Sequence, residues 1–199
     1  MTYEQLFTPG YLEIFCGPMK SGKTLELIHR INKIEYRDDL RFVFLKPKTD
    51  TRDGVIKSRF QTKTFECVFI DETDENDLMK NYDGEDVVAI DEAHFFNKEV
   101  LLNFVEYLLD REKNVIIAGL DLDFRGEPFG AMPDLICKAD KVYKLSGICD
   151  VEGCNKIARM TQRLVNGEPA HYNSPLILVG DAEEGYQTRC REHHMVKRD

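Results

Sequence analysis

The chain has 199 residues and a formal net charge of −9, so it is long enough for one domain, or for one domain with a small appendage. Its acidic residues are spread along the sequence, which argues against broad nucleic-acid binding because such binding favours a basic stripe. No apolar run approaches the ~20 residues that span a bilayer, and the first ten residues lack the basic start and apolar core of a signal peptide, so we expect a cytoplasmic protein without a membrane partner.

A glycine-bounded turn, GPMKSGKT, joins a predicted strand at Tyr11–Phe15 to a predicted helix at Leu25–Ile34. The turn fits G-x-x-x-x-G-K-[ST], the phosphate-binding loop, in which glycines let successive N–H groups face one anion and the helix N-terminus adds positive potential. We expect Lys23 to reach the β- and γ-phosphates of a nucleoside triphosphate and the Thr24 hydroxyl to meet Mg²⁺. The predicted nucleotide contacts are Gly17, Pro18, Met19, Lys20, Ser21, Gly22, Lys23 and Thr24.

Buried strands and helices alternate through the next hundred residues. Arg41–Pro47 and the short run Cys67–Ile70 are predicted strands, and between them Lys48–Arg59 reads as a polar loop. An apolar strand begins at Val87, a helix is expected at Glu99–Glu112 and a buried strand at Asn114–Phe124. This alternation predicts an α/β protein of the P-loop (RecA-like) type, with a mainly parallel sheet flanked by helices over residues 1–144.

Two carboxylates follow the apolar strand that begins at Val87. Asp91 stands at its carboxyl end, where an open α/β sheet gathers ligand groups and where phosphate-loop proteins hold Mg²⁺. Glu92 should face another way, because neighbouring side chains on an extended segment diverge, so it is free to accept or orient a hydroxyl proton of a second substrate. The letters DEAH also occur in helicases, but this acidic chain has room for only one motor fold, so a helicase is the weaker hypothesis.

Cysteines and histidines form spaced sets after Leu145. Cys149 and Cys154 make a C-x4-C pair, and Cys190 precedes His193 and His194. Thiolate and imidazole donors in such sets suit tetrahedral Zn²⁺, and four protein ligands would make the site structural. We therefore predict a small zinc-binding domain over residues 145–199, held together by its metal. The spacing leaves open which of the two histidines is the fourth ligand.

The stretch between these ligand pairs contains an apolar tract, Pro175–Val179, that needs something to cover. A loop that closes over a bound ligand and a strand that pairs with a partner subunit are both open interpretations. The remaining cysteines, Cys16, Cys67 and Cys137, lie in apolar settings, and we expect each to pack in the core.

Six sequence features occur in one order: GPMKSGKT, KPKTDTR, DEAHFF, GLDLDFRGEPFG, MTQRL and the C…C…C-x-x-H set. Together they resemble the type II thymidine kinases, the cytosolic, zinc-containing, ATP-dependent family, from about Leu12 to His194. The phosphate loop alone is widespread, whereas GLDLDFRGEPFG combined with the cysteine set is highly specific.

The resemblance implies roles at the matching positions. Glu92 would be the catalytic base at the 5′-hydroxyl of thymidine, Asp50 would bind the 3′-hydroxyl, and Arg52 would approach the transferring phosphate, with Asp91 on the nucleotide side. The implied zinc ligands are Cys149, Cys154, Cys190 and His193. The implied contacts of the thymine pocket and its lasso-type loop are Met19, Phe95, Leu120, Phe124, Phe129, Thr161, Leu176, Leu178 and Tyr186.

The same resemblance implies phosphorylation of thymidine, and of deoxyuridine, by ATP with Mg²⁺ in pyrimidine deoxynucleoside salvage. It further implies a homotetramer that is feedback-inhibited by dTTP. Three features depart from the family pattern: the first cysteine pair is two residues wider, His94 stands where glutamine is usual, and Lys20 stands where phenylalanine is frequent. We expect the change at Lys20, a variable position of the loop, to be neutral.

The competing hypothesis from another class is a nucleotide-dependent binding module. In that case the zinc appendage would grip a partner, and hydrolysis of a triphosphate without any nucleoside acceptor would act as a switch. A purely structural zinc protein would leave the phosphate loop unexplained.

Overall fold

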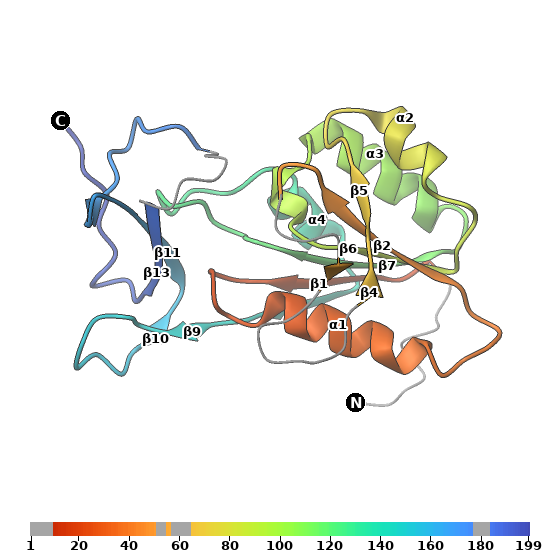
Figure 1. Cartoon of the computed structure of the whole chain (residues 1–199), viewed down its shortest axis with the longest axis horizontal. Helices are drawn as coiled ribbons and strands as arrows, with labels where there is room; N and C mark the ends of the chain where they lie inside the picture. The colour runs from red at the N-terminus through yellow and green to blue at the C-terminus, as the bar shows by residue number, and fades with distance from the viewer. Residues whose placement is uncertain (1–9, 51–54, 57–64, 177–183) are drawn as a thin grey trace.

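The computed structural model describes residues 10–50, 55–56, 65–176 and 184–199 (Figure 1). Within this part of the chain, the largest sheet has six strands in the order β5-β2-β6-β7-β1-β8, and every neighbouring pair is parallel. This arrangement confirms the predicted α/β class. Its strands are β1 (Leu12–Cys16), β2 (Phe42–Pro47), β5 (Val68–Ile70), β6 (Val87–Ile90), β7 (Asn114–Gly119) and β8 (Lys141–Lys144).

Helices cover both faces of this sheet (Figure 1). The helix α1 (Lys23–Ile34) lies on one face, whereas α2 (Glu75–Lys80), α3 (Lys98–Leu109) and α4 (Met132–Lys138) lie on the other. Two apolar clusters follow from this, because successive side chains of a strand point to opposite faces. Phe15 packs with Ile31 on the α1 side, and Ile14 packs with Phe104 on the α3 side.

One strand separates the two halves of the nucleotide motif. β7 pairs with β1 on one side and with β6 on the other, so that Ile14, Ile117 and Ile90 share one row. The carboxyl ends of these parallel strands therefore meet at one edge of the sheet. The phosphate loop leaves β1 there, and Asp91 and Glu92 leave β6 there.

The remaining described chain, here called the C-terminal segment (residues 145–176 and 184–199), contains two small antiparallel sheets beside one end of the large sheet (Figure 1). One pairs β9 (Gly147–Ile148) with β10 (Ile157–Ala158). The other has the order β12-β11-β13, and Thr161 lies opposite Thr188 across β11 and β13. These three strands are β11 (Met160–Val165), β12 (Glu168–Pro169) and β13 (Glu184–Arg189).

Several elements differ from the sequence-based predictions. The strand expected to reach Phe124 ends at Gly119, because residues 120–130 fold back on themselves. The expected loop at Lys48–Arg59 contains β3 (Val55–Ile56), which pairs with β4 (Phe65–Glu66). Cys137 is exposed on α4 and does not pack in the core. The helices α2 and α4 and the strand β8 were not predicted. None of the helices in the described part is long and apolar enough to cross a membrane.

Candidate active site

The phosphate loop has a backbone that requires glycine at its two ends. Gly17 has φ 146°, and a Cβ there would lie 2.5 Å from the carbonyl oxygen of Leu145. Gly22, immediately before α1, has φ 87° and ψ 13°, in the left-handed region that glycine reaches without strain. The loop is therefore shaped by its glycines and held against the chain that follows β8.

Two polar side chains inside the loop are suited to hold an anion. The ammonium group of Lys23 donates a hydrogen bond to the Pro18 carbonyl at 2.8 Å, so it folds back into the loop. Burial lowers the pKa of Lys23, although the carboxylates of Glu92, Asp91 and Asp121 act in the opposite direction. The buried Ser21 hydroxyl has no hydrogen-bond partner among the described residues. Bound phosphate oxygens would satisfy both groups.

The hydroxyl of Thr24 contacts both carboxylate oxygens of Asp91, at 3.2 and 3.1 Å. Asp91 is 2% exposed, and its backbone N–H donates to the Leu45 carbonyl at 3.0 Å. Burial, together with the neighbouring Glu92, raises the pKa of Asp91 to about 7, although Lys46 acts to lower it. A hydroxyl and a buried carboxylate are the hard oxygen donors that Mg²⁺ prefers, so these two residues fit a magnesium site beside the loop.

Glu92 leaves β6 in an unusual backbone conformation, with φ 51° and ψ 38°. This left-handed turn separates its carboxylate from that of Asp91 and places Oε2 3.5 Å from Nε2 of His94. The N–H of Leu120 donates to Nδ1 of the buried His94 at 3.1 Å, so the neutral imidazole carries its proton on Nε2, the atom that faces Glu92. Sequence reasoning did not assign this role to His94.

Rings pack around the His94 imidazole. The ring centroids of Phe95 and Phe129 lie 4.2 and 4.8 Å from that of His94, and the two phenylalanines are 6.2 Å apart. Gly130 has no room for a side chain, since a Cβ would lie 2.6 Å from the His94 carbonyl oxygen. The glutamate thus stands beside an aromatic group, two members of which were predicted to line the nucleoside pocket.

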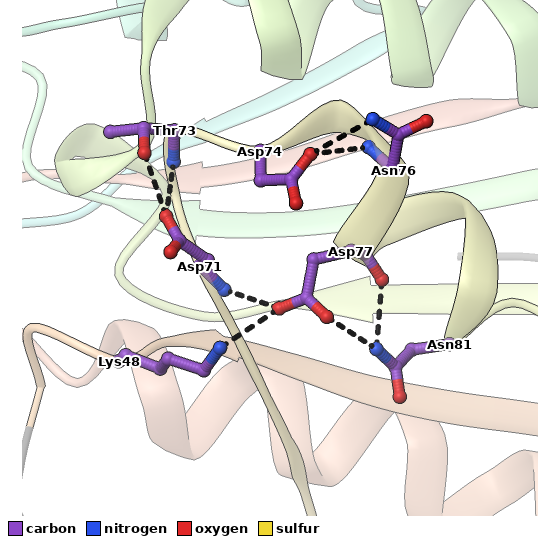
Figure 2. Close-up of polar contacts among 7 residues, drawn as sticks. All are labelled: Lys48, Asp71, Thr73, Asp74, Asn76, Asp77 and Asn81. Carbon is purple, nitrogen blue, oxygen red and sulfur yellow. Dashed lines mark hydrogen bonds and ion pairs between the residues drawn. The ribbon is translucent and has the colours of Figure 1, made fainter.

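Asp50 is fixed by a buried ion pair. Its Oδ2 lies 2.6 Å from Nζ of Lys46, and both residues are buried. The segment that leads from β2 to Asp50 is anchored by the first turn of α2 (Figure 2). There, Asp77 accepts hydrogen bonds from Nζ of Lys48 at 3.0 Å and from the N–H of Asp71 at 2.7 Å. The sequence pointed to Asp50 but not to its partner Lys46, and Arg52 lies outside the described residues.

The turn at residues 120–130 carries two of the predicted aromatic contacts, Phe124 and Phe129. The Asp123 carboxylate fixes this turn by accepting from the N–H groups of Arg125 at 2.8 Å and Glu127 at 3.0 Å. The Phe124 ring lies 5.1 Å from the guanidinium carbon of Arg163, a buried residue of β11. The turn therefore meets the C-terminal segment.

The remaining predicted substrate contacts come from that segment. Thr161 accepts from the N–H of Met19 at 3.1 Å, so these two residues are adjacent. Tyr186 lies opposite Arg163 across β11 and β13. Leu176 is exposed, and Leu178 lies outside the described residues. Arg163 holds the backbone just before this point, because its Nη1 donates to the Pro175 carbonyl at 2.5 Å.

Four side chains of the C-terminal segment form a candidate metal centre. Ligand atoms of Cys149, Cys154, Cys190 and His193 all lie within 4.8 Å of one another. Zinc bound tetrahedrally by sulfur would place its ligand atoms about 3.8 Å apart, so the cluster is close to the required size. His194 points elsewhere, with its Nε2 2.9 Å from the Phe124 carbonyl oxygen, which resolves the choice between the two histidines.

The protonation of the cluster also suits a cation. Against burial, which raises it, backbone hydrogen bonds from Cys190 and Val151 lower the pKa of the Cys149 thiol to about 6. A backbone hydrogen bond from Lys156 lowers the pKa of Cys154, but burial and the neighbouring Cys149 and Cys190 together raise it above its usual value. Three thiolates cannot easily coexist at this distance without a positive ion, and the Cys3His donor set is one that Zn²⁺ prefers.

Residues 10–194 match the model of the thymidine kinase family. The chain belongs to the thymidine kinase family. It is 45% identical over 188 residues to a thymidine kinase of Coprothermobacter proteolyticus, covering 94% of this chain and 91% of that protein. It is 41% identical over 191 residues to a thymidine kinase of Mycoplasmoides gallisepticum, covering 95% of this chain and 83% of that protein.

Likeness to solved structures is weaker. The flagellar accessory protein FlaH of Methanocaldococcus jannaschii is 13% identical with a TM-score of 0.47, over 79% of this chain and 83% of that one. For this member of the thymidine kinase family, the sequence identified the phosphate loop, the carboxylate pair and the four side chains of the candidate metal centre as groups that the structure then brings together. It missed three supporting residues, Lys46, His94 and Asp123. The partner of His94 follows another strand, whereas the partners of Lys46 and Asp123 lie within four residues in the sequence but belong to no motif.

Proposed function

We propose that the chain transfers the γ-phosphoryl group of ATP to the 5′-hydroxyl of thymidine, in pyrimidine deoxynucleoside salvage. Membership of the thymidine kinase family makes it an enzyme that phosphorylates thymidine. The proposal adds the hydroxyl that reacts and the residues that act on it. The observation that carries it is the meeting of Lys23, the Thr24–Asp91 pair and Glu92 at one edge of the sheet.

The nucleotide side of the reaction is served by the phosphate loop. Its backbone N–H groups, the Ser21 hydroxyl and the Lys23 ammonium would bind the phosphate oxygens and offset their charge. Thr24 and Asp91 would hold Mg²⁺, which would supply further positive charge to the β- and γ-phosphates. Arg52 is proposed to approach the transferring group.

Glu92 is proposed as the catalytic base. Its carboxylate would accept or orient the proton of the 5′-hydroxyl while the oxygen attacks the γ-phosphorus in line. Lys23 and Glu92 are close enough to influence one another electrostatically, which supports the proposal that an anion-binding group and a base act on the two sides of one reaction. Both groups are buried or partly buried, so water competes less effectively as the acceptor.

The nucleoside is proposed to lie between the sheet edge and the C-terminal segment. Asp50, held by Lys46, would bind the 3′-hydroxyl of the sugar. The apolar and aromatic side chains would stack on the methylated base, and the tract that includes Leu176 and Leu178 would cover it. The proposed lining is Met19, Phe95, Leu120, Phe124, Phe129, Thr161 and Tyr186.

Several wider properties belong to the same proposal. We propose deoxyuridine as a second acceptor, dTTP as a feedback inhibitor, a homotetramer as the assembly and the cytoplasm as the compartment. We further propose that residues 1–144 form the ATP-binding domain and residues 145–199 a domain held by structural zinc. These properties are supported by the family and by the Cys3His cluster.

An acceptor series tests the proposed reaction. Purified protein should convert ATP and thymidine to ADP and dTMP, whereas thymidine lacking its 5′-hydroxyl should give no product and thymidine lacking its 3′-hydroxyl should still react. Product formation is followed by chromatography, with deoxyuridine, deoxycytidine and a purine deoxynucleoside as further arms. Triphosphate hydrolysis that needs no nucleoside would instead favour the nucleotide-dependent binding module.

Glu92→Gln tests the catalytic base. The variant should bind ATP normally but lower kcat for thymidine by about two to four orders of magnitude, the usual range for loss of a general base. Glu99→Gln, an exposed carboxylate at the start of α3, is the matched control and should keep normal turnover. Unchanged kcat in Glu92→Gln would remove this residue from the mechanism.

A further inference from the structure

The C-terminal segment contacts two successive residues of the phosphate loop, Met19 and Lys20. The peptide groups of Met19 are held on both sides, because its N–H donates to Oγ1 of Thr161 at 3.1 Å and its carbonyl accepts from Oγ1 of Thr188 at 3.0 Å. The two threonines are buried and lie opposite each other on β11 and β13. A cross-strand pair of hydroxyls therefore fixes one residue of the nucleotide-binding turn.

Lys20, the next residue, is held by an ion pair. Its Nζ lies 2.8 Å from Oδ2 of Asp150, and the same oxygen accepts from the N–H of Thr188 at 2.8 Å. Lys20 has φ 59°, a left-handed conformation that costs a side-chain-bearing residue about 1–2 kcal/mol. Because this turn is unfavourable on its own, outside contacts help to keep the loop in shape.

Both anchors adjoin the candidate metal centre. Asp150 directly follows Cys149, and Thr188 lies two residues before Cys190. A backbone contact joins the two ligand-bearing segments at this point, since the N–H of Asp150 donates to the Thr188 carbonyl at 2.8 Å. An ion bound by Cys149 and Cys190 would therefore fix the relative positions of the two residues that hold Lys20 and Met19.

We propose that Thr188 and Asp150 are positioning residues through which zinc in the Cys3His cluster strengthens nucleotide binding at the phosphate loop. This coupling rests on the nucleotide-binding role assigned to the loop in the proposed function. By linkage, the effect is reciprocal: the nucleotide must tighten zinc binding by the same factor by which zinc tightens nucleotide binding. The zinc-binding segment thus has a task beyond its own folding.

The expected effect of the nucleotide on zinc binding gives a test that does not depend on turnover. The apparent zinc affinity of the full chain is measured by competition with a colorimetric chelator, with and without saturating ADP. ADP should tighten zinc binding about fivefold or more, the range that corresponds to typical coupling between sites. In Thr188→Val and in Asp150→Asn, the ratio of the zinc affinities with and without ADP should fall toward one. Thr188→Ser, which keeps the hydroxyl, should retain the wild-type ratio.

Glu192→Gln is the matched control. Glu192 pairs with Lys156 at 2.5 Å beside the cluster, but this ion pair does not touch the phosphate loop. Its loss should change zinc affinity equally with and without ADP. Equal zinc affinities with and without ADP in the wild-type chain, or an undiminished ratio in folded, zinc-binding Thr188→Val and Asp150→Asn, would overturn the coupling.

Binding of ADP to the zinc-loaded wild-type chain, measured by calorimetry, separates the two proposals. If ADP does not bind, the loop has no nucleotide role, and the proposed function fails together with the coupling. If ADP binds but zinc affinity is indifferent to it, only the coupling fails. If Thr188→Val does not fold, Asp150→Asn compared with Glu192→Gln still decides, because both variants remove one ion pair from the surface of the same segment.

Discussion

Asp91 must meet two opposed demands. In the proposed function a nucleotide-bound cation would need a charged carboxylate beside Thr24, yet in the free protein this carboxylate is almost fully buried next to Glu92. Burial and the second carboxylate raise the pKa of Asp91 by more than Lys46 lowers it, so the fold favours the protonated acid. The residue is thus better suited to the complex than to the free protein.

Removing this charge should stabilise the free protein in a pH-dependent way. The pKa of Asp91 rises from 3.8 in the unfolded chain to about 7 in the folded one, so between these values the folded state binds more protons and stability falls as pH increases. Asp91→Asn should therefore melt at a higher temperature than the wild type at pH 8, and the difference in melting temperature should be clearly smaller at pH 5. The measurement is thermal unfolding without nucleotide or Mg²⁺.

Asp86→Asn is the control of opposite sign. A hydrogen bond from the backbone of Arg41 lowers the pKa of Asp86, so its charged form favours folding above pH 4 and the variant should be less stable at both pH values. Equal destabilisation of Asp91→Asn at pH 5 and pH 8 would contradict a raised pKa of the buried Asp91 carboxylate.

Individual residues were predictable where a local motif specified them. Lys23, Thr24 and Asp91 follow from spacing within one strand, turn or helix. His94 was not assigned this role, because its imidazole is fixed by the N–H of Leu120, which follows another strand. Lys46 pairs with Asp50 only four residues further along the chain, but the pair matches no motif, and its burial is visible only in the fold.

The turn at residues 120–130 is the element on which the aromatic contacts depend. Asp123 is 4% exposed and satisfies two backbone N–H groups of the turn with one carboxylate oxygen. Phe124 and Phe129 lie in the same turn and are buried against neighbouring groups. The shape of the turn and the position of its rings are therefore set together.

Asp123→Ala should cost about 2–3 kcal/mol of unfolding free energy, because hydrogen bonds to a charged acceptor are worth about 1.5–3 kcal/mol and two buried N–H groups lose their partner. It should also raise KM for thymidine more than KM for ATP. Urea denaturation and steady-state kinetics measure the two effects. Asp123→Asn keeps an acceptor oxygen, so it should retain most of the stability and a KM for thymidine near that of the wild type. An Asp123→Ala variant as stable as the wild type would show that contacts other than the Asp123 carboxylate hold the turn.

Elements were predictable when their apolar pattern was long and continuous. The helices α1 and α3 and the strands β2 and β6 were expected within a few residues of their observed positions. The strand predicted to continue to Phe124 was too long, because the apolar residues after Gly119 belong to the folded-back turn. The short α2 was missed because it has no long apolar stripe that a sequence pattern could detect. Its start is marked instead by the polar cap at Asp74 (Figure 2).

At the scale of the whole molecule, the C-terminal segment has little apolar core of its own. Its buried cluster consists of Cys149, Ala158 and Cys190, with Val151 and Cys154 packed against it. So small a group cannot supply the free energy that orders five short strands, and a bound metal would supply it instead. The sequence predicted this centre because its ligands stand in two spaced pairs.

Purified protein should therefore contain about one zinc per chain, as expected for a single Cys3His site. Cys149→Ser should lose the metal and expose residues 145–199 to proteolysis, while residues 1–144 resist it. Cys137→Ser, at an exposed cysteine outside the cluster, should keep both metal and resistance. Metal analysis and limited proteolysis give the result, and a folded, protease-resistant wild-type chain without zinc would refute the site.

The strand order has a consequence for how the protein is made. Tyr11, just before β1, is joined to Asn114, the first residue of β7, across 103 residues. At a synthesis rate of roughly 5–20 residues per second, the first strand waits about 5–20 s on the ribosome for its central neighbour. Nascent chains that stop before β7 should thus have no place for a triphosphate, although they already contain the whole glycine-rich turn.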